Sequence, residues 1–579
     1  MTPTPPCPAS ARRPHKRAAQ RAVMAGAGLL LAACAAPADH IAAPAGAGAG
    51  TAAASLPRLS AATPGALQAC AELPGKLALP GVKIVSAVKE RAGALRVSNR
   101  AVDEHCLVTG RLAERVSEVD RQAYAIQFQM RLPVAWNGRF FHQGNGGLDG
   151  FVTDATGAVS GGGPLTGALQ QGFAVLSSDA GHTMRQLPMF GLDPQARLDY
   201  GYQAVAKLTP VARAVIAAAY GREPDRAYFG GCSNGGRHAL VAAARYGDQY
   251  DGILAGNPGI RLPNAALAQL WGAQQWNGLA STGANGTKDL TTAFTPAERK
   301  LVADRLLQRC DGLDGLADGM VLDTAACQRS FDLARDVPTC TAARDGSCLS
   351  ADQKTVLARV FAGGRDVQGR PLYSSFPWDP GLVGADWASW KFVSSITNRD
   401  PVAMAYVFQT PPAGPEAAKD PRAFAMNFPV DRGLDLIAAT QAPFNESSLS
   451  FMVPPASDLA TLRNRGGKVL VFHGTADGVF STDDTVAWYQ RLASSHGGQA
   501  DHFARLYLVP AMNHCRAGPA TDQFDLLGPL VDWVEQGQAP TAVPARVRGA
   551  GSLVANNELP AGWAADRSRP LCPWPQVAR

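Results

Sequence analysis

Apolar and polar positions become regular from about Leu67 onward, where short apolar segments begin to alternate with amphipathic ones. Strict alternation over residues 122–132 predicts a half-buried strand, because successive side chains of a strand point to opposite faces. The spacing of apolar residues over 207–220 predicts a helix that ends before Gly221. Further runs predict strands at 138–142, 173–177 and 227–230 and a helix at 237–246.

This alternation stops at about residue 259 and resumes after residue 457. The interval holds four cysteines, several Asp-Gly turns and many tryptophans and prolines, which predicts an inserted lid. Beyond it the pattern predicts strands at 468–472 and 504–509 and helices at 483–493 and 522–537. Strands that alternate with helices indicate a parallel α/β sheet. We therefore predict an α/β domain formed by residues 61–258 and 458–579, with a lid domain of residues 259–457 inserted into it.

The composition is that of a globular protein, with 46% hydrophobic and 18% charged residues in a chain of 579. Residues 1–33 carry five basic side chains and no acidic one, so subtracting five from the formal net charge of +6 leaves about +1 for the remainder. A nearly neutral protein has no electrostatic attraction for nucleic acid. Nucleic acid is therefore not an expected partner.

The N-terminus has the pattern of a signal peptide, which we assign to residues 1–34. A basic stretch precedes an apolar run at 22–33 that is too short to cross a bilayer as a helix. The run ends in Leu31-Ala32-Ala33-Cys34, which is similar to a bacterial lipoprotein cleavage site with Cys34 as the lipidated residue; ordinary cleavage beside an incidental cysteine is the alternative. Residues 35–60 are mostly Ala, Gly and Pro and predict a flexible linker. The expected location is the periplasm, the outer membrane through a lipid anchor, or the medium.

The cysteines also favour an oxidising compartment. Of 11 cysteines, two belong to the signal peptide and its cleavage site, which leaves nine in the mature chain. Close spacing suggests the disulfides Cys310–Cys327 and Cys340–Cys348, while sequence alone leaves the other connections open.

The first candidate for chemistry is the motif Gly231-Cys232-Ser233-Asn234-Gly235. It lies between a predicted strand and a predicted helix, and a G-x-S-x-G motif in this context is typical of a nucleophile elbow. The flanking glycines permit a sharp turn that exposes the Ser233 hydroxyl. A plain glycine-rich turn is the alternative interpretation.

A serine hydroxyl needs a base to become a nucleophile. His514 follows the predicted strand at 504–509, and Asp477 follows the one at 468–472. The chain order Ser, Asp, His is that of α/β-hydrolases. We predict that His514 is the base and that Asp477 orients it, although either residue alone is equally an ordinary loop residue.

Two cysteines adjoin these residues, because Cys232 directly precedes Ser233 and Cys515 directly follows His514. A serine and histidine that meet bring these cysteines together, so we expect a Cys232–Cys515 disulfide. Two unrelated cysteines, or Cys232 as a thiol nucleophile, are the alternatives.

Hydrolysis at a carbonyl also needs N–H donors for the developing oxyanion. The backbone N–H of Asn234, the residue after Ser233, is the first candidate. We expect the second from the loop Gln143-Gly144-Asn145-Gly146-Gly147, which follows a predicted strand; a flexible turn is the alternative.

A second glycine-rich loop carries Asp311, Asp314 and Asp318 between Cys310 and Cys327. Carboxylates on a tight loop suit a hard cation such as Ca²⁺, although the spacing is not that of an EF-hand and ordinary Asp-Gly turns explain it equally well. Such an ion would be structural, because serine chemistry does not use it.

Together these residues resemble the tannase and feruloyl esterase family, which is marked by a catalytic Ser and His that each adjoin one cysteine of a shared disulfide. Similar stretches at 136–141, 190–199 and 512–515 spread the resemblance over nearly the whole mature chain. The resemblance implies an α/β-hydrolase fold with a large inserted lid domain. It also implies a monomeric serine carboxylesterase whose partners are small esters of aromatic carboxylic acids.

The resemblance further implies roles for individual residues. Gly147 would supply the second oxyanion donor, while Trp390 and Phe480 would line the pocket for the aromatic acid. Arg399 lies in a lid segment that is shorter than in terephthalate-specific members, and it is the candidate for gripping a substrate carboxylate. Cys572 is expected to be unpaired. The implied calcium ligands are the side chains of Asp311, Asp314 and Asp318 and the backbone oxygens of Leu316 and Met320, and the implied disulfides are Cys70–Cys106, Cys232–Cys515, Cys310–Cys327 and Cys340–Cys348.

Three functions follow from these patterns. The first is hydrolysis of a terephthalate monoester, and the second is hydrolysis of a feruloyl, chlorogenic or galloyl ester. The third belongs to another class, a non-catalytic lipoprotein that binds aromatic ligands or glycans. The complete set of serine, histidine and aspartate argues against the third.

Overall fold

The computed structural model describes residues 56–159, 167–397, 399–455 and 458–579. The predicted signal peptide, Cys34 and most of the predicted linker lie outside the described residues, so they stay predictions. In the part of the chain that is described, no helix combines the length and the hydrophobicity needed to cross a membrane.

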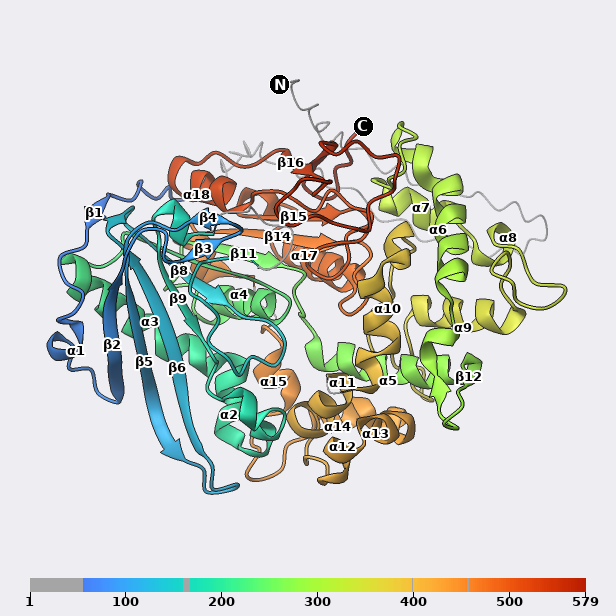
Figure 1. The fold of residues 1–579 in the computed structure, drawn as a ribbon, viewed down its shortest axis with the longest axis horizontal. Helices are drawn as coiled ribbons and strands as arrows, with labels where there is room; N and C mark the ends of the chain where they lie inside the picture. Colours follow the sequence, from blue (N-terminus) through green and yellow to red (C-terminus); the bar gives the residue numbers. More distant parts are fainter. Residues whose placement is uncertain (1–55, 160–166, 398, 456–457) are drawn as a thin grey trace, which may run out of the picture.

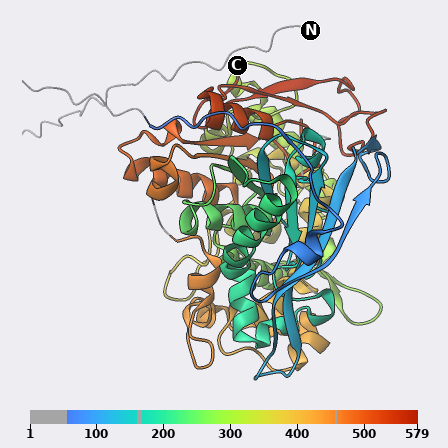
Figure 2. The same cartoon turned by 90° about the vertical axis from the view of Figure 1, so that its left-hand side faces the viewer.

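Within this part, nine strands form a central sheet in the order β15-β14-β11-β10-β8-β9-β6-β5-β2 (Figure 1). The strands from β15 to β9 are parallel, whereas β6, β5 and β2 add on antiparallel. Both views show the long antiparallel strands, in blue, at one side of the molecule (Figure 1 and Figure 2). The strands are β2 (Val82–Glu90), β5 (His105–Val116), β6 (Ala123–Pro133), β8 (Arg139–Gly144), β9 (Ala174–Ser178), β10 (Arg226–Cys232), β11 (Gly252–Gly256), β14 (Lys468–Gly474) and β15 (Ala504–Val509).

The α/β class is therefore confirmed, but the prediction of a parallel sheet is wrong for one edge. A short turn joins β5 to β6, and a connection this short can only join antiparallel neighbours. The sequence pattern also missed β2, β5 and β11. Strand β11 is fully buried and rich in glycine and alanine, so it carries neither alternation nor a β-branched run.

The parallel register aligns the carboxyl ends of four strands. Cys232 of β10 pairs with Gly256 of β11, which pairs in turn with Phe472 of β14, and Gly231 pairs with Gly144 of β8. Loops that leave these ends must meet at one edge of the sheet, which is where α/β proteins bind ligands.

Helices cover both faces of the sheet. On β14, Val469 and Val471 pack in the cluster that includes α3, α4 and α17, while Leu470 and Phe472 pack with α18 on the other face. Successive side chains of β14 therefore point to opposite faces of the sheet, and both faces are buried. The helices are α3 (Ala204–Tyr220), α4 (Asn234–Arg245), α17 (Thr482–Ser495) and α18 (Leu527–Gln536).

None of these helices begins at the predicted residue, and α3 and α17 start at Ala204 and Thr482 rather than at residues 207 and 483. Helix α4 starts at Asn234 rather than at residue 237, directly after the G-x-S-x-G serine. Helix α18 starts at Leu527 rather than at residue 522, and the Asp525 carboxylate accepts the backbone N–H groups of Leu527 at 2.8 Å and Gly528 at 3.1 Å in its first turn. The Asp522 carboxylate instead pairs with Arg548.

A mainly helical insertion separates β11 from β14 and packs beside the sheet (Figure 1). Its apolar residues, among them those of α5, which are buried nearly all round, pack in one cluster that also takes in Phe190, Tyr200 and Phe480 from outside the insertion. Its role as a lid, and the predicted domain boundaries, stay predictions. Its helices are α5 (Leu262–Leu279), α6 (Pro296–Cys310), α7 (Thr324–Ser330), α8 (Leu333–Asp336), α9 (Ala351–Ala362), α10 (Ala385–Phe392), α11 (Asp400–Ala403), α12 (Glu416–Lys419), α13 (Pro421–Asn427), α14 (Gly433–Ala438), α15 (Ser448–Met452) and α16 (Ala460–Asn464).

Candidate active site

Ser233 occupies a strained turn between β10 and α4. Its backbone has φ of 66° and ψ of −127°, a conformation that residues with a side chain rarely adopt. A Cβ at Gly231 would lie 2.5 Å from the carbonyl oxygen of Gly144, and a Cβ at Gly235 would overlap the same oxygen. The two glycines of the motif are therefore required by the approach of β8, and the serine between them is only half-buried at the strand ends.

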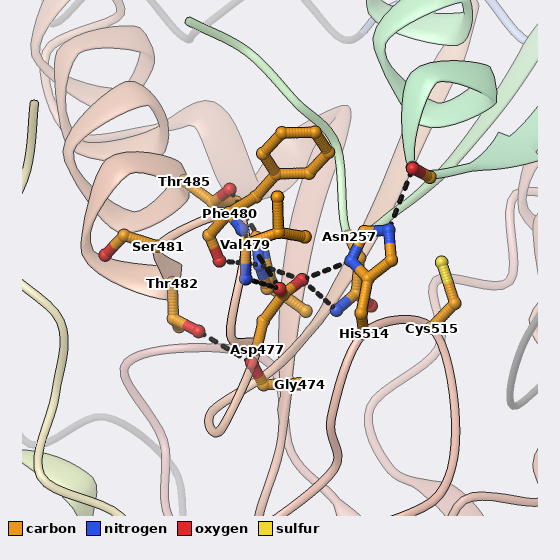
Figure 3. A network of polar contacts seen from close by, with 12 residues as sticks. Asn257, Gly474, Asp477, Val479, Phe480, Ser481, Thr482, Thr485, His514 and Cys515 are labelled. Atoms are coloured by element: carbon orange, nitrogen blue, oxygen red, sulfur yellow. Dashed lines mark hydrogen bonds and ion pairs between the residues drawn. The ribbon is translucent and has the colours of Figure 1, made fainter. Parts of the chain in front are cut away.

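The structure brings His514 and Asp477 to this serine from two other loops. The Ser233 hydroxyl lies 2.8 Å from His514 Nε2, and His514 Nδ1 lies 2.8 Å from Asp477 Oδ2. Figure 3 shows the imidazole of His514 turned edge-on toward the Asp477 carboxylate. In this arrangement Nδ1–H donates to the carboxylate, which leaves Nε2 free to accept the serine proton.

Asp477 accepts hydrogen bonds from both backbone and side-chain donors (Figure 3). Its Oδ1 accepts the backbone N–H groups of Val479 at 2.8 Å and Phe480 at 3.0 Å, and its Oδ2 accepts Asn257 Nδ2 at 2.8 Å. Burial by itself raises the pKa of the Asp477 carboxyl. The charge of His514 and the hydrogen bonds from the neighbouring imidazoles outweigh burial, so the pKa lies well below its ordinary value and the group stays ionised.

Asn257 is a site residue that the sequence analysis missed. It directly follows β11, a strand that the hydrophobic pattern did not predict, and its backbone φ of 36° is unusual for a residue with a side chain. Its position at the end of a parallel strand is the signal that a correct prediction of β11 would have supplied.

The disulfide Cys232–Cys515 links the elbow to the loop of His514, with 6.2 Å between the two Cα atoms. It joins residues 283 positions apart in the chain. Because its sulfur atoms are bonded to each other, Cys232 has no thiol to act as a nucleophile. The bond also restrains the separation of Ser233 and His514, the two residues that it flanks.

The loop after β8 lies against Ser233. A Cβ at Gly146 would be 3.9 Å from the Cβ of Ser233, and Gly147 has a φ of +68° with open space where its side chain would be. Within the described residues, the backbone N–H groups of Gly147 and Asn234 make no hydrogen bond with the protein. Both predicted oxyanion donors therefore lie near the serine and are available to a ligand.

Two aromatic rings of the site contact His514. Trp390 of α10 and Phe480 lie with their ring centres 5.2 and 5.3 Å from that of the imidazole, both edge-on. The guanidinium of Arg399 lies 5.1 Å from the centre of the Trp390 ring and 5.8 Å from that of Phe480. Arg399 also forms an ion pair with Asp400, and its Nε is buried without a hydrogen-bond partner. The structure thus brings together three residues that the resemblance had assigned to the substrate pocket.

In the acidic loop between Cys310 and Cys327, carboxylates accept hydrogen bonds from backbone N–H groups of the same loop. Asp311 Oδ1 accepts the N–H groups of Asp318 and Gly319 at 3.0 Å each, and Asp314 Oδ1 accepts that of Leu316 at 2.9 Å. Asp318 Oδ2 is paired with Arg567 and Arg569, while its Oδ1 is buried without a partner. Among the described residues, no three His, Cys, Asp or Glu side chains converge into a metal site.

The disulfides Cys70–Cys106, Cys310–Cys327 and Cys340–Cys348 are also present. Cys572 is disulfide-bonded as well, so the expectation that it is unpaired is wrong. That expectation rested on the absence of the C-terminal partner cysteine that the resemblance implies, and a disulfide partner need not lie close in the sequence.

Comparison with known proteins gives a consistent result. A sequence model of the family described as tannase and feruloyl esterase matches residues 106–579. Mono(2-hydroxyethyl) terephthalate hydrolase of Piscinibacter sakaiensis is 40% identical over 527 residues, which cover 86% of this chain and 85% of that protein. Feruloyl esterase B of Aspergillus niger is 26% identical over 551 residues, which cover 90% of this chain and 95% of that protein.

Solved structures show the same fold at lower identity. Feruloyl esterase B from Aspergillus oryzae superimposes with a TM-score of 0.69 at 22% identity, over 88% of this chain and 95% of that one. Tannin acyl hydrolase from Aspergillus niger gives a TM-score of 0.63 at 21% identity, over 87% and 92% of the two chains.

Removal of the Cys232–Cys515 disulfide should lower the reactivity of Ser233. In the variant Cys232→Ala/Cys515→Ala the loop of His514 loses its covalent link to the elbow. We expect labelling of Ser233 by a fluorophosphonate probe to slow by roughly 10-fold, because small misplacements of reacting groups have effects of this order. The control Cys340→Ala/Cys348→Ala removes a disulfide from the insertion and should label at the wild-type rate. If the two variants are labelled at the same rate and both keep their fold by circular dichroism, the Cys232–Cys515 disulfide does not control the reactivity of Ser233.

Proposed function

This chain belongs to the tannase and feruloyl esterase family, and we propose that it is a serine carboxylesterase acting on esters of aromatic carboxylic acids. The observation that carries the proposal is the unbroken chain of hydrogen bonds from Asp477 through His514 to Ser233. In the proposed roles, Ser233 is the nucleophile, His514 is the general base, and Asp477 keeps the base in the required tautomer.

The reaction proceeds in two halves. His514 Nε2 takes the Ser233 proton as Oγ bonds to the ester carbonyl carbon, and the resulting oxyanion accepts the N–H groups of Gly147 and Asn234. When this intermediate collapses, the bond to the alcohol breaks and His514 gives its proton to the departing oxygen. Water, deprotonated by His514, then attacks the acyl-serine, and Ser233 recovers its proton as the acid leaves.

The substrate we propose first is a monoester of terephthalic acid. Trp390 and Phe480 provide aromatic surfaces beside His514, and Arg399 lies over both rings. An aromatic acid bound against these rings can present a second, free carboxylate to the guanidinium, whose Nε lacks a partner. The relative named mono(2-hydroxyethyl) terephthalate hydrolase supports this choice.

A specific observation favours a second candidate, a feruloyl or galloyl ester. The ion pair with Asp400 already neutralises Arg399, so the pocket also suits an aromatic acid without a free carboxylate. Relatives named feruloyl esterase B support this alternative.

A substrate panel tests the function and separates the candidates. We expect wild type to hydrolyse mono(2-hydroxyethyl) terephthalate faster than methyl ferulate or methyl gallate, measured as kcat/KM by chromatography of the released acid. Ser233→Ala should lose at least about 10³-fold in kcat on each substrate while keeping its fold, because the nucleophile is gone. Retained turnover in Ser233→Ala would overturn the mechanism, and faster hydrolysis of ferulate or gallate would replace the first substrate by the second.

The role of Arg399 predicts a difference between two nearly identical esters. Mono(2-hydroxyethyl) terephthalate carries a free carboxylate, which bis(2-hydroxyethyl) terephthalate lacks. In Arg399→Ala we expect kcat/KM for the monoester to fall by about 10- to 100-fold, the worth of a hydrogen-bonded charge pair, while the diester changes little. Arg399→Lys keeps the charge and should fall in between. Equal losses on both esters would show that Arg399 does not contact the carboxylate.

We also propose a structural calcium site at the acidic loop. The donor types suit a hard cation, because the loop offers three carboxylates and backbone oxygens and the buried Oδ1 of Asp318 has no other partner, but the three carboxylates would have to turn toward one another to bind it. Asp311, Asp314 and Asp318 would bind through side chains and Leu316 and Met320 through backbone oxygens, and the arginines on Asp318 would have to turn away.

Thermal unfolding checks the calcium proposal. After treatment with a chelator, we expect added Ca²⁺ to raise the Tm of wild type by roughly 5 °C, because a ligand that binds only the folded state stabilises it. The variant Asp314→Asn should lose this response. The control Asp345→Asn changes an exposed aspartate in the neighbouring disulfide loop and should keep it. If added Ca²⁺ does not shift the Tm of wild type, and no calcium is retained after dialysis, the acidic loop does not bind the ion.

A further inference from the structure

The loop that carries Gly147 is fixed by buried side chains that the reaction itself does not use. We propose that Asp149, Tyr200, Asn234 and Arg237 form a clamp that holds the two oxyanion donors, the N–H groups of Gly147 and Asn234, at a set distance and orientation. This inference rests on the proposed ester hydrolysis and concerns positioning residues, since none of the clamp side chains touches the reacting atoms.

The clamp is a closed ring of hydrogen bonds. Asp149 Oδ2 accepts Asn234 Nδ2 at 2.8 Å, and Asn234 Oδ1 accepts Arg237 Nε at 2.7 Å. Arg237 Nη2 donates to the carbonyl of Tyr200 at 3.0 Å, and the Tyr200 hydroxyl donates to the carbonyl of Gly147 at 3.1 Å. Asp149 is two residues from Gly147, so the ring begins and ends on the same short loop.

Water does not compete for these hydrogen bonds. Tyr200, Asn234 and Arg237 are fully buried, and Asp149 is 2% exposed. Burial raises the pKa of the Asp149 carboxyl well above its ordinary value, and the charge of Arg237 offsets only part of that shift. Burial also lowers the pKa of Arg237 to about 10, which still leaves it charged at neutral pH. The amide of Asn234 lies between the two groups and links them by hydrogen bonds.

The conformation of the loop needs such external support. Gly147 and Asp149 both have positive φ, +68° and +55°, and Asp149 adopts this value as a residue with a side chain. Between them, the carbonyl of Leu148 accepts Nε2–H of the buried His182 at 2.7 Å. Strained backbone persists only where its surroundings over-determine it. Each of the three consecutive residues is anchored by a side chain from a different part of the chain.

The side chain of Asn234 thus has a task separate from that of its backbone. The backbone N–H of Asn234 faces the position next to Ser233, while its side-chain amide donates to Asp149 and accepts from Arg237. A carboxylate at this position could accept from Arg237 but would repel Asp149. The chemistry of the clamp therefore requires one amide and one carboxylate at positions 149 and 234.

The cleanest test removes a single hydroxyl. Tyr200→Phe deletes the hydrogen bond to Gly147 and preserves the packing of the ring. On p-nitrophenyl acetate, a plain ester that does not depend on the aromatic pocket, we expect kcat to fall by about 10-fold with KM nearly unchanged. The matched control is Tyr250→Phe, which removes another fully buried hydroxyl, bonded to His142 at 2.9 Å and Thr209 at 2.6 Å, that takes no part in the clamp. The kcat of Tyr250→Phe should stay at the wild-type value, even if its Tm falls by as much as that of Tyr200→Phe.

A reciprocal exchange provides a second readout. Asn234→Asp places two carboxylates against each other and should lose about 100-fold in kcat. Asn234→Asp/Asp149→Asn restores one amide and one carboxylate, and it should recover most of that loss. Binding of a trifluoromethyl ketone, whose adduct with Ser233 carries an oxyanion, should weaken in each variant by the factor that kcat/KM loses.

The outcomes separate this inference from the proposed function. A wild type that neither turns over any ester nor reacts with a fluorophosphonate overturns both. An active wild type in which Tyr200→Phe keeps its kcat, or in which Tyr200→Phe and Tyr250→Phe lose equally, overturns the clamp alone. Failure of the reciprocal exchange to recover activity, with the fold intact, also overturns it.

Discussion

The close approach of two strand ends is the constraint on which the rest of this site depends. The carbonyl oxygen of Gly144, at the end of β8, lies where a side chain on Gly231 or Gly235 would have to be. Without side chains at these positions, β8 and β10 can lie side by side up to the elbow. The loop after β8 then passes directly beside Ser233, and the helix after the elbow begins at Asn234. The position of the nucleophile, and the passage of the loop of Gly147 beside it, depend on this contact.

The two buried carboxyl groups Asp477 and Asp149 lie in different surroundings. Asp477 is surrounded by hydrogen-bond donors from backbone and side chains, which hold its pKa low and keep it ionised beside His514. Asp149 has fewer donors, so burial raises its pKa well above the ordinary value, and the amide of Asn234 links it to Arg237. The first arrangement suits a group that must stabilise an imidazolium. The second suits a group whose task is to stay in place.

The sheet and the insertion contribute different parts of the site. Ser233, Asp477 and His514 all lie on loops that leave the carboxyl ends of sheet strands. Trp390 and Arg399 come from the insertion, where α10 and the start of α11 approach His514. The residues of the proposed triad are held by the rigid sheet and can stay the same while the inserted segment changes its length and side chains. This division explains how relatives named for terephthalate, ferulate and tannin esters can share one fold.

The sequence by itself determined the α/β class, the elbow and the three residues of the proposed triad. These are local signals: an apolar strand before a glycine-rich turn, and an aspartate and a histidine that each follow a strand. Parallel pairing brings such strand ends together, so their meeting could be expected before the structure was known. The adjacent Cys232 and Cys515 followed by the same reasoning.

Only the tertiary structure decided the rest. Asn257 follows a strand with no alternation, and the ring through Asp149 and Tyr200 joins residues whose spacing in the chain has no regular period. The place of Arg399 over two aromatic rings depends on how the insertion packs, and the antiparallel edge depends on how short turns pair strands. These features rest on contacts between distant, buried groups. A pattern of hydrophobic positions records which side chains are buried, but it does not record which of them meet.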